Sequence, residues 1–296
     1  MDAEKFKRLF CFGYGYSAAA LTRLLVADGF AVAGTVRNLE KNKALISQGV
    51  EPFVFNGRDH LAADALDGVT HVLVSVPPLD GADPVLARCR DQLAALRPDW
   101  IGYLSTTGVY GNRDGAAVDE GSALKPTSDR ARARVQAELG WLRFGDENDI
   151  LVQVFRLAGI YGPGRSALDQ LRAGTARRID KPGHLFSRIH VDDIARTLTA
   201  SIARPRAGGI YNVCDDEPAE PRALIEYGAA LLGIDPPPLV AFADAAFSDM
   251  ARSFWADNKR VDNTRIKREL GACLQYPTYR EGLRAILAAE GGAVEG

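Results

Sequence analysis

The chain has 296 residues, with 36 basic and 38 acidic side chains and a formal net charge of −2. This near balance argues against a nucleic-acid-binding surface, and no stretch approaches the roughly 20 apolar residues of a membrane span. The four cysteines, Cys11, Cys89, Cys214 and Cys273, stand far apart without a CxxC pair or metal-ligand spacing. We interpret them as thiols in a reducing compartment and expect no metal site.

The N-terminus resembles a secretory signal, with a basic start, an apolar stretch from Leu9 and alanines at 18–20. Glycines interrupt that stretch, and Arg23 falls inside its apolar continuation. The glycine-rich turn described below explains the same residues better, so we expect the protein to be cytoplasmic.

The first half of the chain alternates short apolar runs with amphipathic stretches. Runs rich in Val, Ile, Phe and Leu are expected to form strands at 8–12, 31–36, 52–55, 70–76, 100–105 and 150–155. Helices are expected between them, as at 17–29 and 83–97, the second with Asp83 as N-cap and Pro84 at its first position. Strands that are apolar on both faces and joined by crossover helices predict a doubly wound α/β fold with a parallel sheet.

The alternation of predicted strands and helices ends after residue 165. Helices are expected at 166–174, 191–204, 220–233, 261–271 and 279–290, and one further strand at 209–213. We therefore predict a first domain of residues 1–165, to which 188–214 returns. Residues 166–187 and 215–296 are predicted to form a smaller, discontinuous and mostly helical domain.

A glycine-rich turn joins the first strand to the first helix, in the order Gly13-Tyr14-Gly15-Tyr16-Ser17-Ala18. The glycines permit a tight turn and let a pyrophosphate approach the backbone, while the helix N-terminus supplies N–H groups and the positive end of its dipole. The small Ala18 allows close packing of helix on strand. In this context the turn predicts an NAD(P)-binding Rossmann fold, which leaves the smaller domain on the substrate side.

The end of the second strand indicates which dinucleotide binds. An NAD site usually places Asp or Glu there to hold the adenosine ribose. Here the strand ends Gly-Thr-Val-Arg-Asn, and the first acid after it is Glu40. Arg37 could grip a 2′-phosphate in bidentate fashion, or it could be a solvated surface arginine. We predict NADP in preference to NAD.

Several motifs in this order resemble the extended or atypical short-chain dehydrogenases/reductases of the NAD-dependent epimerase/dehydratase type. YLSTTGVYG at 103–111 is similar to the family's fifth strand, which implies an active-site hydroxyl at Thr106. FRLAGIYGPGR at 155–165 is similar to its sixth strand and following loop. RIHVDDIA at 188–195 and GIYNVCDD at 209–216 are similar to the motifs that lead the chain back to the sheet.

The resemblance implies redox chemistry based on a YxxxK motif in the helix after the fifth strand. In register, those two positions are Arg130 and Arg134, and none of the nine tyrosines begins a YxxxK. A guanidinium stays protonated and cannot act as a general acid or base. Arg134 could still hold ribose or phosphate, and Arg130 could bind an anionic substrate group or an oxyanion. The alternative is a solvated helix face with an Arg134–Glu138 pair.

The sequence leaves the identity of a proton donor open. Thr106 is a poor acid alone, and Tyr110 and Tyr161 lie in loops that resemble pocket walls. By resemblance, His190 of the His-Val-Asp-Asp motif is a packed, structural histidine.

The chain also departs from the family pattern at a position that binds phosphate. Phe186 stands where many nucleotide-sugar enzymes of the family carry a phosphate-binding arginine, although Arg188 follows two residues later. Arg165 and Arg252 are alternative anion-binding candidates in the second domain.

The candidate catalytic residues are therefore Thr106, Arg130 and Arg134. The candidate cofactor contacts are Gly13, Tyr14, Gly15, Tyr16, Ser17, Arg37, Asn56, Gly57, Val76 and Leu157. One hypothesis is an NADP-dependent oxidoreductase or epimerase-like enzyme acting on a small, anionic carbonyl or sugar. The other is a non-catalytic NAD(P)-binding sensor or regulatory protein. The resemblance also implies a homodimer contact on the arginine-bearing helix.

Overall fold

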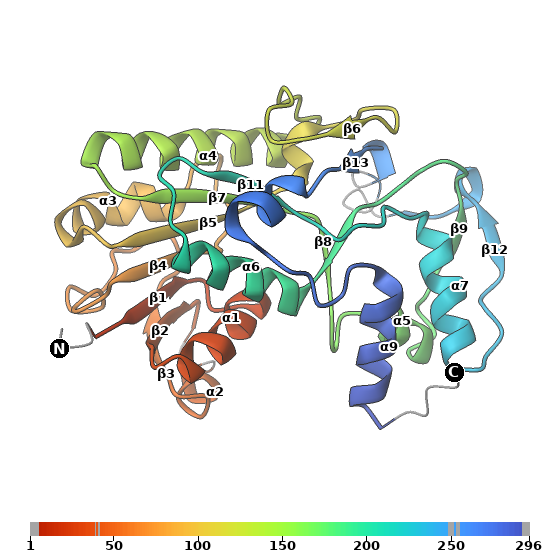
Figure 1. Ribbon diagram of the computed structural model, residues 1–296, viewed down its shortest axis with the longest axis horizontal. Coiled ribbons are helices and arrows are strands. Elements are labelled where there is room, and N and C mark those ends of the chain that lie inside the picture. Colours follow the sequence, from red (N-terminus) through yellow and green to blue (C-terminus); the bar gives the residue numbers. More distant parts are fainter. Residues whose placement is uncertain (1–5, 39, 41, 248–251, 253–254, 292–296) are drawn as a thin grey trace.

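The computed structural model describes residues 6–38, 40, 42–247, 252 and 255–291. A seven-stranded parallel sheet forms its centre, in the order β11-β7-β5-β4-β1-β2-β3 (Figure 1). Its strands are β1 (Arg8–Phe12), β2 (Ala31–Val36), β3 (Val50–Val54), β4 (His71–Val74), β5 (Trp100–Thr106), β7 (Val152–Leu157) and β11 (Ile210–Val213). The strand order reverses direction between β1 and β4, so the crevice at their carboxyl ends is the point where such sheets bind nucleotides. The predicted doubly wound α/β fold is confirmed.

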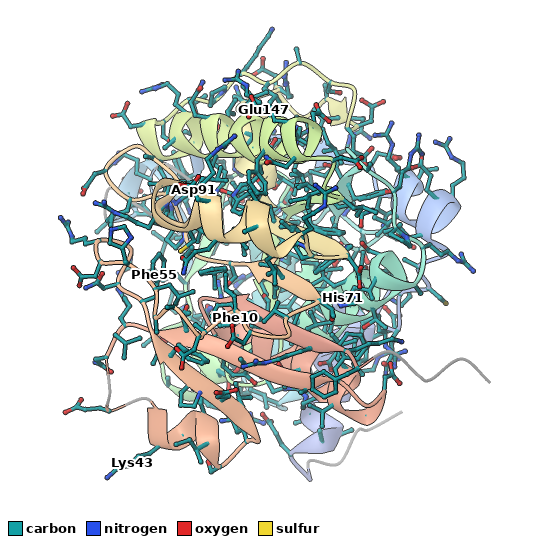
Figure 2. The ribbon with its side chains drawn as sticks, turned by 90° about the vertical axis from the view of Figure 1, so that its left-hand side faces the viewer. Phe10, Lys43, Phe55, His71, Asp91 and Glu147 are labelled. Carbon is teal, nitrogen blue, oxygen red and sulfur yellow. The ribbon has the colours of Figure 1, made fainter. Side chains whose placement is uncertain are left out.

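Each face of the sheet has its own apolar core. Leu9 and Cys11 of β1 pack in one cluster with helices α1 (Tyr16–Ala27) and α6 (Val191–Ala203). The alternate residues Phe10 and Phe12 pack in a second cluster with helices α3 (Pro84–Leu96) and α4 (Asp129–Asn148). This alternation is the reason why the strands are apolar throughout, since both faces are covered. Figure 2 shows Asp91 on α3 and Glu147 on α4 in the outer layer, with Phe10 inside.

The expected start of α3 is confirmed. The Asp83 carboxylate accepts hydrogen bonds from the backbone N–H of Val85 (2.9 Å) and Leu86 (3.0 Å). Its other oxygen accepts one from the Trp141 indole at 3.1 Å. One N-cap therefore also ties α3 to α4, the helix that carries the arginines.

Outside the main sheet, the described residues form three small parallel strand pairs and a helical layer (Figure 1). The pairs are β8 (Gly159–Tyr161) with β10 (Arg188–His190), β9 (Arg178–Asp180) with β12 (Leu239–Ala241), and β6 (Ala117–Val118) with β13 (Arg260–Val261). The helices α5 (Ala167–Arg172), α7 (Pro221–Leu231) and α9 (Tyr279–Ala289) share a third apolar cluster. Of the described helices, none is long and apolar enough to cross a membrane.

The chain returns to the main sheet as expected through α6 and β11, whereas β10 pairs outside it. The helix expected over 261–271 is shorter. The Asp262 carboxylate accepts the backbone N–H of Thr264, and a π-helical turn, η4 (Ile266–Leu270), ends at Gly271 in the left-handed region. The side chains of η4 join the core cluster of α6. The domain limits at 165, 188 and 214 stay predictions.

Candidate active site

The turn after β1 has the shape that a pyrophosphate site needs. A Cβ atom at Gly13, where φ is +84°, would lie 2.8 Å from Val76 Cγ1 and 2.9 Å from Ser75 Oγ, so only glycine fits there. At Gly15, the N-cap of α1, a Cβ would meet nothing within 4 Å. No side-chain cap is present at this end of α1 among the described residues. The first N–H groups of a helix have no partner inside the helix, and no side chain caps them here, so these residues fit a dinucleotide phosphate.

The tyrosines of the turn point into the protein. The backbone N–H of Tyr14 donates to Thr35 O at 2.8 Å, and its ring lies on Gly34, where a Cβ would be 2.8 Å from Tyr14 Cδ2. The Tyr16 hydroxyl donates to Pro163 O at 2.9 Å, which links the turn to the loop after β8. Ser17 is buried. The Tyr14 N–H is therefore already engaged, whereas Tyr16 and Ser17 can offer a cofactor their backbone N–H groups more readily than their side chains.

The residues predicted at the ends of β2 and β3 have different surroundings. Arg37 directly follows β2, is exposed, and has no ion pair with any described residue. The Asn56 side chain accepts the backbone N–H groups of Arg58 (2.8 Å) and Asp59 (3.0 Å), so it closes the loop after β3. Gly57, with φ at +80°, packs against Pro84. Arg37 is thus free to reach a ligand, whereas Asn56 and Gly57 shape the loop.

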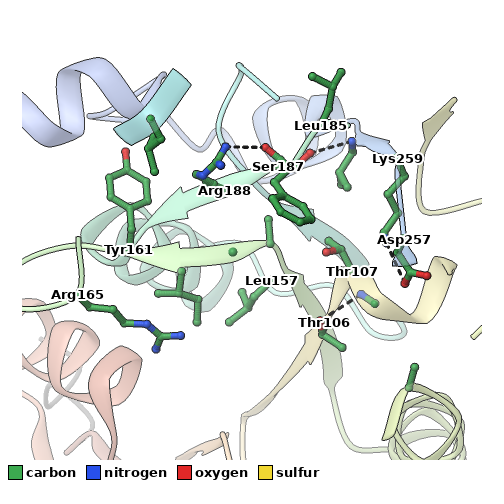
Figure 3. A pocket seen from close by; sticks show the side chains of 18 of the residues that line it. Thr106, Thr107, Leu157, Tyr161, Arg165, Leu185, Ser187, Arg188, Asp257 and Lys259 are labelled. Carbon is green, nitrogen blue, oxygen red and sulfur yellow. Dashed lines mark hydrogen bonds and ion pairs between the residues drawn. The ribbon is translucent and has the colours of Figure 1, made fainter. Parts of the chain in front are cut away.

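A cavity of about 470 Å³ lies at the carboxyl ends of β5 and β7 (Figure 3). The three candidate catalytic residues, Thr106, Arg130 and Arg134, all line it, and so does Leu157. Thr106 Oγ1 accepts the backbone N–H of Gly108 at 3.1 Å, which leaves its hydroxyl proton for another acceptor. The structure thus gathers the predicted residues in one place; their roles stay predictions.

The two arginines of the cavity are held differently. Arg134 Nη1 donates to the Tyr103 hydroxyl (2.9 Å) and to Leu104 O (3.0 Å), which ties α4 to β5. The alternative of an Arg134–Glu138 pair is wrong, because Glu138 points inward and pairs with Arg156 at 2.7 Å. Arg130 is exposed and has no hydrogen bond or ion pair within the described part of the chain. Arg130 therefore has its whole guanidinium available for a ligand.

A buried polar network lies under the cavity. Glu138 and Arg156 are 1% and 3% exposed, and Glu138 also accepts the Ser105 hydroxyl. Arg156 Nη1 donates to the Tyr110 hydroxyl at 2.9 Å, and that hydroxyl donates to Asn212 Oδ1 at 2.7 Å. The expectation that Tyr110 forms a pocket wall is wrong, since the ring is fully buried and burial raises its pKa to about 12.

Tyr161 does line the cavity, as expected, but its hydroxyl points away toward α9 (Figure 3). That hydroxyl lies 3.4 Å from Thr278 O, and burial raises the pKa of Tyr161. His190 is the buried N-cap of α6: its Nδ1 accepts the backbone N–H of Asp192 at 3.2 Å. Burial lowers the pKa of His190 to about 4, which confirms the prediction of a packed, structural histidine.

The cavity wall is rich in cations. Arg165, an exposed residue, lines it, whereas Arg252 is exposed and is not among the described residues of the wall. Arg188 is buried behind Phe186 and donates to Phe186 O (2.9 Å) and Ala219 O (3.2 Å). With Arg130, Arg134 and Lys259, the wall holds five basic side chains against one acidic side chain. An anionic ligand suits this imbalance.

Sequence reasoning missed two charged residues of the wall, Asp257 and Lys259. Lys259 Nζ lies 3.5 Å from Asp257 Oδ2, and Asp257 Oδ1 accepts the Thr127 hydroxyl at 2.9 Å. No motif marks this pair, and Thr127 is 130 residues away from Asp257 along the chain. The pairing of β13 with β6 brings the segment to the cavity, and the Asn258 side chain adds hydrogen bonds to Leu185 N and Gly183 O.

Comparisons with known proteins agree with this geometry. Residues 79–214 match the model of the NAD dependent epimerase/dehydratase family. The chain is 50% identical to a functionally unknown conserved protein from Silicibacter pomeroyi, with a TM-score of 0.88 over 96% of this chain and 99% of the other. Protein YeeZ of Escherichia coli is 28% identical over 92% of this chain and 97% of its own length. dTDP-glucose 4,6-dehydratase from Bacillus anthracis, solved with NAD, is 14% identical with a TM-score of 0.78 over 96% of both chains, a likeness of fold.

Proposed function

Because residues 79–214 match the NAD dependent epimerase/dehydratase family model, we propose that the chain is an NADP-dependent oxidoreductase or epimerase-like enzyme of the extended short-chain dehydrogenase/reductase type. Its substrate is a small, anionic carbonyl compound or sugar. The observation that carries this proposal is the cavity beside Thr106, whose wall holds five basic side chains and one acidic side chain.

Different residues are assigned to cofactor binding, to substrate contact and to the exclusion of water. NADPH, when bound, supplies the hydride. The N–H groups at the start of α1 hold its phosphates, and Arg37 pairs with the 2′-phosphate. Thr106 donates a hydrogen bond to the substrate oxygen, and Arg130 binds the anionic group or stabilises negative charge that develops on that oxygen. Leu157 and Phe186 supply apolar wall that keeps water away.

Replacing Arg37 tests the choice of cofactor. Arg37→Ala is expected to weaken NADPH binding by about tenfold or more, because a charge-assisted contact to phosphate is lost, and to leave NADH binding unchanged. Calorimetric titration with both nucleotides measures this. Arg143→Ala, another exposed arginine, is the control and should bind both as the wild type does. Equal losses for NADPH and NADH would contradict the assignment.

Replacing Arg130 tests the anionic substrate. Arg130→Ala is expected to keep NADPH affinity and to raise the KM for anionic carbonyl compounds by about tenfold or more, with a smaller change for neutral ones. Turnover of a panel of 2-oxo acids and matching neutral ketones, followed by NADPH absorbance, gives the comparison. Arg132→Ala is the matched control, because Arg132 is exposed on the same helix and pairs with Asp129. The same KM shift in both variants would remove Arg130 from the site.

A non-catalytic NAD(P)-binding sensor is the second candidate. It is favoured by Arg134, whose guanidinium already holds Leu104 O and the Tyr103 hydroxyl. A sensor predicts NADPH binding without turnover across the whole panel, and Arg134→Ala should then change stability more than nucleotide affinity.

A further inference from the structure

The cavity holds few groups that can exchange a proton. Its arginines stay protonated, and its threonine and serine hydroxyls are weak acids. Tyr161 points toward Thr278, and burial raises its pKa. Among the described residues of the wall, Asp257 and Lys259 are the titratable groups that remain.

Lys259 is placed by the strand that follows it. β13 pairs with β6 through Arg260 and Val261, which fixes the backbone next to the cavity. Lys259 is 8% exposed, and its Nζ has one contact with a described group, the Asp257 carboxylate at 3.5 Å. An ammonium carries three N–H bonds, so Lys259 keeps hydrogen-bonding capacity that this contact does not use.

Asp257 connects this lysine to the predicted catalytic residues. Its second oxygen accepts the hydroxyl of Thr127, which directly precedes Ser128, the N-cap of the helix that carries Arg130. Figure 3 shows Asp257 and Lys259 on the side of the cavity where Thr106 and Thr107 lie. The amine is therefore held at the same wall as the hydroxyl that would meet a substrate oxygen.

The surroundings ease proton exchange at Lys259. Burial lowers the pKa of its amine; Asp257 opposes this effect, and Arg113 adds to it. His184 also faces the pair, and its pKa is lowered to about 4, mainly by burial and then by Lys181 and Lys259. His184 therefore contributes no charge near neutral pH, and burial leaves the lysine easier to deprotonate than an exposed one.

We propose that Lys259 is the proton donor and acceptor of this site, and that Asp257 is its positioning residue. This assignment rests on the proposed function. In the reductive direction the carbonyl carbon gains a hydride from NADPH, and the π electron pair of the C=O bond moves onto oxygen. That oxygen takes one proton from the Lys259 ammonium. The products are the alcohol, NADP⁺ and a neutral amine, which regains its proton from water.

An NMR titration tests the amine without requiring turnover. Reductive methylation of the full chain with ¹³C-formaldehyde labels the lysines, and Lys259→Arg identifies the Lys259 signal by its loss. That signal is expected to titrate at lower pH than dimethylated lysine in a model peptide. It should also shift when NADP⁺ and phenylglyoxylate, the anionic carbonyl probe, are added together. Lys43, which is exposed on helix α2 (Asn42–Ile46) and is not among the residues that line the cavity, is the control signal that should not respond.

A Lys259 signal that titrates as the model peptide does, or that ignores the probe, overturns the proposal. Absence of NADPH binding to the wild type would instead overturn the proposed function, because the pH titration without ligands reports on the amine alone. If phenylglyoxylate binds and is not reduced, the same titration still tests whether the Lys259 amine responds to a bound carbonyl compound.

Kinetics separate proton transfer from anion binding. Lys259→Met and Lys259→Arg are both expected to bind NADPH as the wild type does and to lose about 100-fold in kcat for phenylglyoxylate. The arginine variant keeps the charge and cannot give up a proton, so an anion-holding role predicts wild-type kcat for it. That result would overturn the proposal. Lys43→Met should match the wild type, and circular dichroism checks the fold of each variant.

Discussion

Glu138→Gln is expected to lower the free energy of unfolding by about 3–5 kcal/mol, because it leaves Arg156 as a buried cation without its partner. The two side chains are 1% and 3% exposed, and three hydrogen bonds join the Arg156 guanidinium to the Glu138 carboxylate. Glutamine preserves the shape of the side chain, so the change isolates the charge. Urea denaturation followed by tryptophan fluorescence measures the loss, since Trp141 lies on the same helix.

The same helix supplies the matched control. Glu147 pairs with Arg90 at the surface, where the two side chains are 50% and 41% exposed. Glu147→Gln is therefore expected to change the free energy of unfolding by less than about 1 kcal/mol. Similar losses in the free energy of unfolding for the two variants would show that the buried pair contributes no more than the surface pair. Replacing both Glu138 and Arg156 by Met should recover most of the stability, because no unpaired charge remains.

Gly13→Ala is expected to weaken NADPH binding by about 100-fold or more. Two effects add: alanine is strained at a φ of +84°, and its Cβ would lie 2.8 Å from Val76 Cγ1 and 2.9 Å from Ser75 Oγ. The turn must shift to relieve that contact, and the shift moves the N–H groups that would hold the phosphates. Calorimetric titration with NADPH measures the loss.

Gly29→Ala separates strain from contact. Gly29 has nearly the same φ, +82°, at the opposite end of α1, and a Cβ there would meet nothing within 4 Å. It should lower stability by about 1 kcal/mol through backbone strain and leave NADPH affinity unchanged. Wild-type NADPH affinity in Gly13→Ala would mean that the turn is not the phosphate site.

The locations of Gly13 and Glu138 in the fold explain how the fold supports the site. Gly13 fixes the turn at the carboxyl end of β1, where the nucleotide is expected. Glu138 ties α4 to Arg156 on β7 and to Ser105 on β5, and Ser105 directly precedes Thr106. A loss at either place would move the residues that the proposed function depends on.

The sequence by itself determined the architecture and the approximate place of the site. Strands apolar on both faces, such as β1, had to lie between two layers, since exposed apolar faces are costly. The turn from Gly13 to Ala18 could be recognised because its glycines mark local backbone freedom, which sequence records directly. Thr106, Arg130 and Arg134 also line one cavity, as their order along the family motifs implied.

Only the tertiary structure decided which of those side chains are free. Sequence could not tell that Glu138 turns inward to Arg156 and leaves Arg134 to hold Leu104 O. It could not show Tyr110 buried, or Lys259 and Asp257 brought to Thr127 from 130 residues away. Periodicity reports which face of a helix is apolar. The partner of a buried charge is chosen by whichever opposite charge the packed sheet brings within hydrogen-bond distance, and that distance exists only in the folded chain.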